Sequence, residues 1–301
     1  MEKPMTSIII INYNTAKLTF ECVESIFKFE NQSKLEIIVV DNASKEEDYL
    51  KLSELLEFFD DVTIVRSKIN LGFGGGNMLG TQFATGDFLC FLNSDTLLVE
   101  PIFKQLISFA NSTSDFGVSG IQILDAEKKE SISYRYFEGV RYKIFGRKFL
   151  ELTQKKKIAQ NHVLEVDFVL GSLMFFKKEI FNKIGGFDTN IFLYYEETDV
   201  CYRLKKLSYK SYFISDLKYI HLEGQSSVFN YNLKLEHWIS YFYVTRKNFG
   251  LFKYFIIKYF LLLNYMFKAP FKKKNSFIFK KMLQMNESLA MSLKHQQKRV
   301  D

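Results

Sequence analysis

The stretch Asp87-Phe-Leu-Cys-Phe-Leu-Asn-Ser-Asp-Thr96 joins an apolar run of strand length to a small polar cluster. Its carboxylate, Asp95, follows the run directly, where a buried strand of an α/β sheet places a ligand site. Mg²⁺ and Mn²⁺ prefer such oxygen ligands, usually one or two carboxylates completed by substrate phosphates. Alternatively, Asn93, Ser94 and Asp95 cap the next helix, since all three residue types are good N-caps. The stretch alone leaves both interpretations open.

The sequence before this stretch alternates strand and helix patterns, and one further helix follows it. Strands are expected at Ser7–Asn12, Leu35–Val40, Val62–Val65 and Phe88–Leu92, and helices at Ala16–Phe29, Tyr49–Phe59, Gly75–Ala84 and Leu98–Ala110. This order predicts a mostly parallel sheet with helices on both faces. A sheet of this kind binds its ligands at the carboxyl ends of the strands, and here all four ends are polar.

The pattern changes after about residue 115. Strands are expected at Phe116–Ile123, Val166–Phe176 and Tyr212–Ile214, a turn at 185–188 and a short helix at Glu197–Leu207. Residues 125–162 are charged and aromatic without a clear period, which is typical of an excursion or loop. The fold class is therefore α/β with a mixed sheet.

Composition limits the class of protein. The chain has 301 residues, 47% of them hydrophobic, and three cysteines that lie far apart in apolar contexts. This indicates a globular, reduced, cytoplasmic protein with core cysteines. The apolar run Ile8–Ile11 is too short for the core of a signal peptide, so none is expected.

The net charge of +7 is local. Residues 238–286 hold ten of the 41 Lys and Arg residues and no Asp or Glu, which leaves 31 basic against 34 acidic residues elsewhere. A nucleic-acid partner is not expected, because basic residues are not spread over a folded face with a readable motif. The tail from Ile239 is aromatic, basic and helical in character, with no apolar run long enough to span a bilayer. It is typical of a segment that lies on an anionic membrane, and the alternative is a basic helix packed on the core.

Other residues suggest ligand contacts, each with a structural alternative. Asp41 follows the second strand and either accepts a hydrogen bond from the N3–H of uracil or thymine or caps a helix. Tyr13 either stacks on that base or covers the sheet edge. The glycine run Asn70–Asn77 either cradles phosphates or forms a flexible loop into a helix. It matches neither phosphate-binding glycine motif, because no Gly-Lys-Ser/Thr follows and Asn77 replaces the last glycine of G-x-G-x-x-G.

The stretch Phe192–Arg203 packs three acids into four residues, Glu196, Glu197 and Asp199. One of them is a candidate general base. Asp199 and Arg203 are four residues apart, so an ion pair on a helix is the alternative for that residue. A charged helix start is the alternative for the other two. His221 is either a metal ligand or an ordinary hydrogen-bonded histidine.

Together, these motifs resemble the family 2 glycosyltransferases of bacterial surface polysaccharides, and within them the rhamnosyltransferase-like branch. The matching segments cover roughly residues 5–230 in the family's order. They are Ser7–Asn14, Val39–Ser44, Asn70–Asn77, Phe91–Thr96, Gly185–Asp188, Phe192–Arg203 and His221-x-x-Gly-Gln-Ser226. The combination is specific for the family and weakly specific for the sugar.

The resemblance implies a GT-A fold and inverting transfer from a nucleotide-diphosphate sugar, with dTDP-rhamnose as the leading donor and UDP-sugars such as galactofuranose, glucose or N-acetylglucosamine behind it. It implies that Asp41 reads the pyrimidine with Tyr13 and Arg66 nearby, and that Asn93 and Asp95 hold ribose and metal. Further implied donor contacts are Asn12, Asn14, Asn42, Gly72, Asn77 and Ser94.

By the same resemblance, His221 completes a Mg²⁺ or Mn²⁺ site and Glu197 is the base, ahead of Asp199 and Glu196. Asn93 stands where many relatives have the first Asp of D-x-D, which removes one charge at the ion. The implied acceptor is a growing cell-surface polysaccharide or a lipid-linked glycan.

The expected organisation is a transferase domain over residues 1–236 and a helical, membrane-associating tail over 237–301, on the inner face of the plasma membrane. Two alternatives come from other classes. A catalytically silent module that binds nucleotide sugar or glycan is supported by Asn93, and intact Glu197 and His221 argue against it. A membrane-surface scaffold is opposed by the full set of site motifs.

Overall fold

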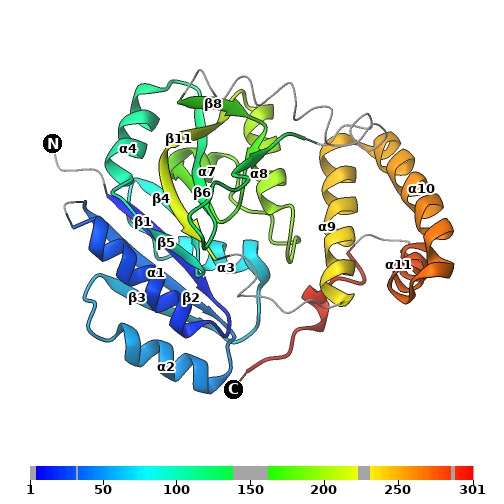
Figure 1. The fold of residues 1–301 in the computed structure, drawn as a ribbon, viewed down its shortest axis with the longest axis horizontal. Coiled ribbons are helices and arrows are strands. Elements are labelled where there is room, and N and C mark those ends of the chain that lie inside the picture. The colour runs from blue at the N-terminus through cyan, green and yellow to red at the C-terminus, as the bar shows by residue number, and fades with distance from the viewer. Residues whose placement is uncertain (1–4, 32, 138–161, 223–230, 286–288, 301) are drawn as a thin grey trace.

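The computed structural model describes residues 5–31, 33–137, 162–222, 231–285 and 289–300 (Figure 1). Within these residues, nine strands form one sheet in the order β3-β2-β1-β4-β10-β6-β11-β5, with β8 beside β11. The strands are β1 Thr6–Asn12, β2 Leu35–Asn42, β3 Val62–Ser67, β4 Phe88–Asn93, β5 Thr96–Leu98, β6 Phe116–Leu124, β8 Val163–Val166, β10 Leu173–Lys177 and β11 Lys210–His221. A separate pair joins β7 Tyr134–Arg135 to β9 Phe168–Val169.

The sheet is mixed, as the sequence predicts. Strands β1 to β4 are parallel, whereas β10 runs antiparallel between β4 and β6. The register aligns the polar strand ends: Asn12 is paired with Asp41, and Asp41 with Arg66. Asn93 is paired with Ile11, one residue before Asn12. The four strand ends therefore form one continuous polar edge.

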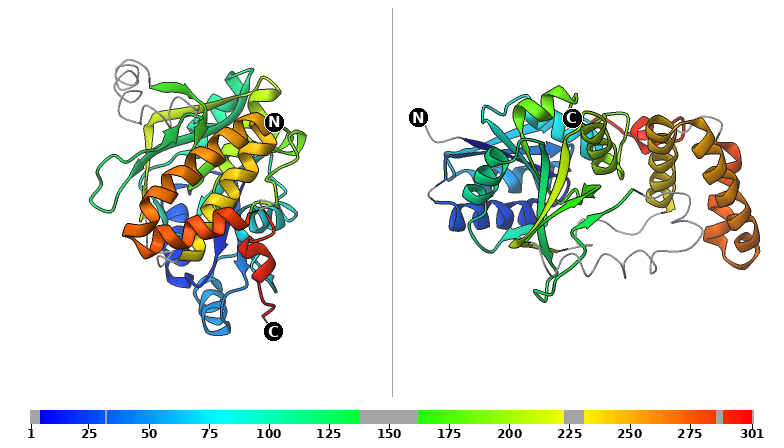
Figure 2. Two further views of the ribbon diagram at one scale, coloured as in Figure 1. Left: turned by 90° about the vertical axis from the view of Figure 1, so that its right-hand side faces the viewer. Right: turned by 90° about the horizontal axis from the view of Figure 1, so that it is seen from above.

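Helices cover both faces of the sheet (Figure 2). One face carries α1 Ala16–Phe29, α2 Glu46–Leu56 and α4 Phe103–Ser112, and the other carries α3 Gly72–Thr81, α7 Lys178–Lys183 and α8 Glu196–Lys206. Successive side chains of a strand point to opposite faces. Ile8 and Ile10 accordingly pack in the first core and Ile9 in the second. The continuous isoleucine run reflects this two-sided burial.

Three expected elements are different in the structure. The helix expected from Leu98 begins at Phe103, and Thr96–Leu98 is strand β5. The helix-cap interpretation of Asn93, Ser94 and Asp95 is therefore wrong, because a strand follows them. The single strand expected at Val166–Phe176 is divided among β8, β9 and β10, because Asp167 and the pair Gly171-Ser172 are turn-forming residues.

The third difference is β11, which extends from Lys210 to His221 rather than over three residues. Its pairing with β6 shifts register between Ile214 and Lys218. The polar residues at this irregularity, Ser215 and Asp216, interrupt the apolar pattern in the sequence. A β-bulge of this kind hides strand continuity from periodicity. The glycine run also differs from a flexible loop, because α3 begins at Gly72.

The C-terminal segment is helical and packs on the domain (Figure 1). It contains α9 Tyr231–Phe249, α10 Leu251–Lys268, the 3₁₀ turn η1 Ala269–Phe271, α11 Lys273–Gln284 and the 3₁₀ turn η2 Leu293–Gln296. These helices bury a core of their own around Trp238, Phe242 and Ile257. The boundary expected between residues 236 and 237 falls inside α9. None of the helices in the described ranges is both long enough and apolar enough to traverse a bilayer.

Candidate active site

Asn12 connects three elements at the polar edge of the sheet. Its Nδ2 donates to Asp41 Oδ1 at 3.0 Å, to Ser44 Oγ at 3.1 Å and to Asp48 Oδ2 at 3.0 Å. Its Oδ1 accepts from Thr19 Oγ1 at 2.8 Å. The side chain is fully buried, and each such bond to a carboxylate is stronger than a neutral one. Asn12 therefore orients Asp41 from behind.

Asp41 also faces a cation. Arg66 Nε lies 3.6 Å from Asp41 Oδ2, and the Arg66 guanidinium stacks 3.8 Å above the ring of Tyr49. Tyr13, at the end of β1, leaves 46% of its surface exposed. Asn14 adopts a left-handed backbone with φ of 56° and accepts from the Lys45 amide at 2.9 Å. At this corner the ring of Tyr13 is exposed, whereas Asp41 is fully buried behind its hydrogen bonds.

Asn42 and the start of α3 are tied to each other. The amide of Leu71 donates to Asn42 Oδ1 at 2.9 Å, and Asn42 Nδ2 donates to Gly72 O at 3.1 Å. Gly72 has φ of +73°, and a Cβ there would lie 2.0 Å from Phe192 O. Asn77 is buried and donates to Phe73 O at 3.1 Å. Glycine at position 72 therefore allows α3 to pack closely against Phe192. The side chains of Asn42 and Asn77 form their hydrogen bonds within the protein.

Asp95 and His221 meet at the end of the opening stretch. His221 Nε2 lies 3.2 Å from Asp95 Oδ1, because β11 pairs with β5 and places His221 opposite Thr96. The Leu222 amide also donates to the Asp95 backbone oxygen at 2.9 Å. Ser94 Oγ lies 3.2 Å from Thr15 Oγ1, and Asn93 is partly buried. The structure thus brings together the two residues predicted to hold a metal.

The side chains of Asp95 and His221 fit a divalent cation whose other ligands come from outside this pair. One carboxylate oxygen and one imidazole nitrogen converge, and the described part of the chain contains no group of three or more His, Cys, Asp or Glu side chains arranged for a metal. Mg²⁺ and Mn²⁺ accept few protein ligands when substrate phosphates supply the rest. The remainder of the predicted His221 motif, residues 224–226, lies outside the described residues.

Glu196 and Glu197 begin α8 after two residues with strained backbone. Tyr194 and Tyr195 have φ of 72° and 71°, a left-handed conformation that aromatic residues rarely adopt. Glu196 is 3% exposed, and burial together with the charge of Glu197 raises its pKa well above the usual range. Burial also raises the pKa of Glu197, while the charge of Arg135 acts in the opposite direction. A carboxylate with a raised pKa is a better proton acceptor.

Asp199 lies on the same helix in different surroundings. Its Oδ2 pairs with Arg203 Nε at 2.9 Å, which confirms the ion pair expected from their spacing. Its Oδ1 accepts from Asn248 Nδ2 at 2.9 Å and pairs with Lys247 Nζ at 2.8 Å. Asp199 is fully buried, so its contacts fix α8 to α9. Among the three acids, only Glu197 lines a pocket.

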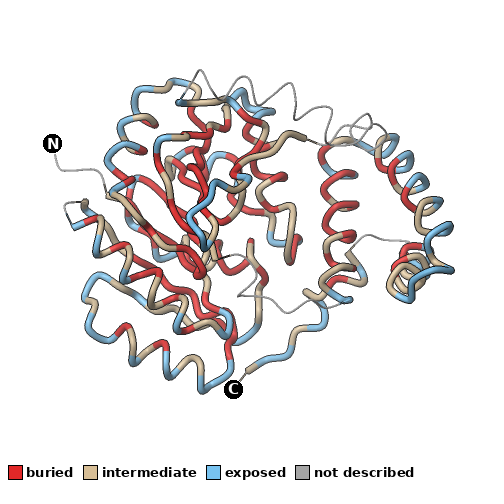
Figure 3. Tube along the Cα trace, in the orientation of Figure 1, coloured by how far each residue is buried: buried red, intermediate tan, exposed pale blue. Residues whose placement is uncertain are grey.

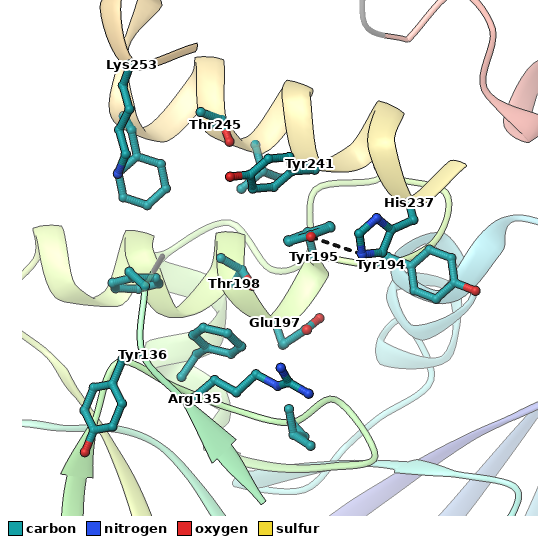
Figure 4. A pocket seen from close by; sticks show the side chains of 15 residues that line it. Arg135, Tyr136, Tyr194, Tyr195, Glu197, Thr198, His237, Tyr241, Thr245 and Lys253 are labelled. Carbon is teal, nitrogen blue, oxygen red and sulfur yellow. Dashed lines mark hydrogen bonds between the residues drawn. The ribbon is translucent and has the colours of Figure 1, made fainter. Parts of the chain in front are cut away.

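That pocket, of about 420 Å³, lies between α8 and α9 (Figure 4). On the side of the domain it is lined by Arg135, Tyr136, Phe137, Phe168, Leu170, Tyr194, Tyr195, Glu197 and Thr198. On the side of the tail it is lined by His237, Tyr241, Val244, Thr245, Phe249 and Lys253. Figure 4 shows the Glu197 carboxylate and the Arg135 guanidinium close together, below the residues of α9.

One short segment connects the pocket to the polar edge. Leu170 lines the pocket, and the Cβ position of Gly171 is 4.0 Å from Glu197 Oε2. Ser172 O accepts from the Asn93 amide at 3.0 Å. Three consecutive residues thus span from Glu197 to the strand end that precedes Asp95. The pocket and the edge are adjacent parts of one site.

Several lining residues are absent from the expectations drawn from the sequence. Arg135 and Tyr136 lie in the region without a clear period, and His237, Tyr241 and Lys253 belong to the tail. One signal was present: the large apolar and aromatic residues of α9 are not confined to one face, which is typical of a helix buried on several sides. That pattern indicates burial, but it does not name the partner surface.

The fold and the polar edge define a GT-A type of glycosyltransferase architecture. Two solved structures share it: GalNAc-T7 with UDP, GalNAc and Mn²⁺ has a TM-score of 0.62 at 16% identity over 81% of this chain and 48% of that one. The mannosyltransferase PcManGT from Pyrobaculum calidifontis, in complex with GDP-Man and Mn²⁺, has a TM-score of 0.56 at 17% identity over 82% of this chain and 64% of that one.

The sequence model of glycosyl transferase family 2 matches residues 7–185, more than half of the chain, so the protein belongs to that family. It is 26% identical to the low-salt glycan biosynthesis hexosyltransferase Agl10 of Haloferax volcanii, over 66% of this chain and 61% of the relative. It is 23% identical to the rhamnosyltransferase WbbL of Escherichia coli, over 72% of this chain and 83% of the relative. The chain thus spans less than two thirds of the archaeal relative and of both solved structures.

Proposed function

We propose that the protein is an inverting, metal-dependent glycosyltransferase that moves a sugar from a nucleotide-diphosphate donor to a hydroxyl of a glycan acceptor. The observation that carries this proposal is the position of Glu197, a partly buried carboxylate in a pocket adjacent to the edge that holds Asp95 and His221. Membership of family 2 supports it. The similarity to WbbL makes L-rhamnose from dTDP-rhamnose the leading donor, ahead of UDP-sugars.

The residues have separate roles in this reaction. In this proposal Asp41 and Tyr13 contact the base of the donor, and Asp95 with His221 would hold a divalent cation, which would supply positive charge near the diphosphate. Mn²⁺ in both similar structures supports this assignment. Glu197 takes the proton of the acceptor hydroxyl as its oxygen bonds to the anomeric carbon. The bond from that carbon to the diphosphate oxygen breaks on the opposite side, so configuration inverts.

Glu197→Gln tests this function. The substitution keeps the shape of the side chain but removes its basicity, and general bases contribute about 10²- to 10⁴-fold. We expect transfer, measured as nucleotide diphosphate released in the presence of acceptor, to fall by about 10³-fold. Glu165→Gln, on β8 and away from the pocket, is the control and should keep full activity. Equal release by wild type and Glu197→Gln would refute this mechanism, and no release by either from every donor tried would favour the catalytically silent binding module that Asn93 suggests.

A membrane surface is the proposed location of the acceptor. Much of α10 is exposed (Figure 3), and its exposed large residues form a stripe of apolar side chains at helical spacing. The stripe consists of Phe252, Phe255, Ile256, Tyr259, Phe260, Leu263, Met266 and Phe267. The opposite side, with Tyr254, Ile257 and Leu261, is buried. Four lysines follow at 268 and 272–274, and basic plus aromatic surfaces of this kind bind anionic bilayers.

Co-sedimentation with vesicles tests this location. The triple variant Phe252→Ser, Tyr259→Ser and Phe267→Ser changes side chains that are each more than half exposed, so folding should be preserved. We expect its binding to anionic vesicles to fall at least about 10-fold. Phe58→Ser, a similarly exposed ring just after α2 and outside the C-terminal helices, is the control. Unchanged binding of the triple variant would exclude α10 as the contact surface.

A further inference from the structure

One side of α9 carries a row of polar side chains directed at α8 and at the turn before it. The members of the row are His237, Ser240, Tyr243 and Lys247. They are three or four residues apart, so they share one side of the helix. Each of them contacts the segment from Asp188 to Asp199, which carries Glu197. The row is therefore matched to the segment that presents the proposed base.

The first two members of the row contact the turn just before Glu197. His237 Nε2 lies 3.2 Å from Tyr195 Oη, a contact that is marked in Figure 4. Ser240 Oγ donates to Leu193 O at 2.8 Å. Tyr195 is one of the two residues with left-handed backbone, so these contacts lie on the strained part of the segment.

Lys247 joins the two ends of the same segment. Its Nζ lies 2.7 Å from Asp188 Oδ2 and 2.8 Å from Asp199 Oδ1. The side chains of these carboxylates are 12% and 0% exposed. Asp188 precedes the strained turn, and Asp199 lies in the first turn of α8. One ammonium group thus closes the segment into a loop that contains Glu197.

The charge of Lys247 matters more at Asp188 than at Asp199. Asp199 also pairs with Arg203 Nε at 2.9 Å, whereas Asp188 forms no salt bridge with another cation among the described residues. Burial acts to raise the pKa of Asp188, but hydrogen bonds, with that from Lys247 first among them, lower it. Removal of the cation would leave a charge without its counter-ion in a largely buried place, and such a charge favours rearrangement of the segment around it.

We propose that Lys247 is a positioning residue for transfer: by joining Asp188 to Asp199 it fixes the strained turn and directs the carboxylate of Glu197 toward the acceptor hydroxyl. The inference rests on the proposed transferase function and adds a residue of the tail to its machinery. Lys247 is not among the residues that line the pocket, so its effect on the reaction passes through the segment that carries Glu197.

Hydrogen exchange of the full chain tests the effect on the turn. Lys247→Gln should speed the exchange of the amides of residues 189–196 at least about 10-fold, while the amides of β1 to β4 exchange as in wild type. Lys247→Arg keeps a cation that can reach both carboxylates and should restore slow exchange. Arg246→Gln, at the neighbouring exposed cation, should change nothing. Unchanged exchange in Lys247→Gln, or equally fast exchange in Lys247→Arg, would overturn the proposal.

Kinetics test the effect on the reaction. Release of nucleotide diphosphate is measured from dTDP-rhamnose, UDP-glucose and UDP-N-acetylglucosamine, with octyl glycosides of glucose, galactose and N-acetylglucosamine as acceptors. Lys247→Gln should lower kcat at least about 10-fold, because a small displacement of the base is costly. The KM for the donor should stay within about 2-fold, because the polar edge is unchanged. A raised KM with unchanged kcat would contradict the proposal.

Two controls accompany the kinetic measurement. Lys178→Gln removes a lysine of α7 whose Nζ donates to Ala84 O at 2.7 Å, and it should keep the kcat of wild type. Ser240→Ala removes one bond to the turn and should lower kcat about 5-fold. It provides the same test if Lys247→Gln does not fold, and a wild-type kcat in Ser240→Ala would then refute the positioning role.

A double-mutant cycle separates positioning from general destabilisation. If Lys247 acts through Glu197, Lys247→Gln should cause less than about 2-fold further loss of kcat in the Glu197→Gln background. The same loss in both backgrounds would indicate a merely structural effect and would overturn the inference. Release that falls in Glu197→Gln but not in Lys247→Gln refutes the positioning role alone. Release that is insensitive to Glu197→Gln refutes the proposed function itself.

Discussion

The two halves of the site are built in different ways. At the sheet edge, polar side chains bond to one another: Asn12 alone contacts Asp41, Ser44 and Asp48. In the pocket, polar groups stand among aromatic rings, and burial raises the pKa of Glu197. The edge is assembled by neighbouring strands in register, whereas the pocket needs elements from residue 135 to residue 253.

This difference suggests a division of labour. A hydrogen-bonded network holds its members in fixed geometry, which suits a ligand part common to many donors, such as a nucleotide. A desolvated carboxylate between aromatic walls is poised for proton transfer and depends on its neighbours for its pKa. Substitutions that disturb the geometry of the edge should therefore be poorly tolerated. Substitutions that change a charge in the pocket should shift the pKa of its carboxylate.

The largest effect is expected where the two halves meet. Gly72→Ala would place a Cβ 2.0 Å from Phe192 O at φ of +73°, so we expect the free energy of unfolding to fall by about 4 kcal/mol. Gly185→Ala is the matched control, because φ is +79° but no atom lies within 4 Å of its Cβ position. That variant should lose only about 1–2 kcal/mol. Urea denaturation measures both, and equal losses would show that α3 is not fixed to the loop before α8.

The next effect concerns the edge alone. Asp95→Asn removes the carboxylate that faces His221, so transfer should fall about 100-fold and the Mn²⁺ concentration for half-maximal activity should rise. The chain offers a matched control in Asp216, an exposed aspartate 2.6 Å from His162. Asp216→Asn should leave activity unchanged. A metal response identical to that of wild type in Asp95→Asn would refute the assigned site.

Glu196→Gln tests how far the charge of Glu196, buried beside Glu197, lowers the stability of the folded state. The raised pKa of Glu196 means that the folded state binds its proton more tightly than the unfolded state, so the carboxylate lowers stability as pH rises above its ordinary pKa. Gln does not ionise, and the variant should gain about 1 kcal/mol relative to wild type between about pH 5 and about pH 8. Glu21→Gln, on the surface of α1, should show no such difference. A gain independent of pH would mean that Glu196 has the same pKa in the folded and the unfolded state.

The smallest effect is a shift in a pH profile. Burial raises the pKa of Glu197 and Arg135 opposes that shift, so Arg135→Gln should raise the pKa further. Because the base must be deprotonated, the acid limb of kcat/KM for transfer should move to higher pH. Arg246→Gln should leave the limb in place. Movement to lower pH in Arg135→Gln would contradict the assignment of Glu197 as the base.

The residues of the polar edge could be predicted from the sequence, because the signal for each one lies in the few residues around it. Each polar residue follows an apolar strand, and parallel strands bring their ends to one line, so Asp41 and Asp95 could be assigned to one edge. Helix α1, Ala16–Phe29, was predicted to the residue, because its apolar spacing is regular. The predicted element boundaries were wrong where the hydrophobic pattern does not follow the strand pairing. An example is β11, whose bulge interrupts the alternation of apolar and polar residues.

The pocket could not be predicted in the same way. Arg135 is positioned by the pairing of two-residue strands, and Tyr241 by the docking of α9, and neither contact has a local signature. The role of Asp199 shows the same limit. Its pair with Arg203 followed from spacing, whereas its bonds to Lys247 and Asn248 depend on contacts almost fifty residues away, which only the fold reveals.

The left-handed tyrosines before α8 have a consequence for biosynthesis. The strain at Tyr194 and Tyr195 persists because α9 holds the preceding loop: Ser240 Oγ donates to Leu193 O at 2.8 Å, and Lys247 pairs with Asp188 at 2.7 Å. Translation delivers β11 before α9, so a nascent chain can complete its sheet while this loop is still free to relax. Glu197 would then lack its final orientation. The strained turn before Glu197 can therefore be held in its final form only after α9 has emerged and docked.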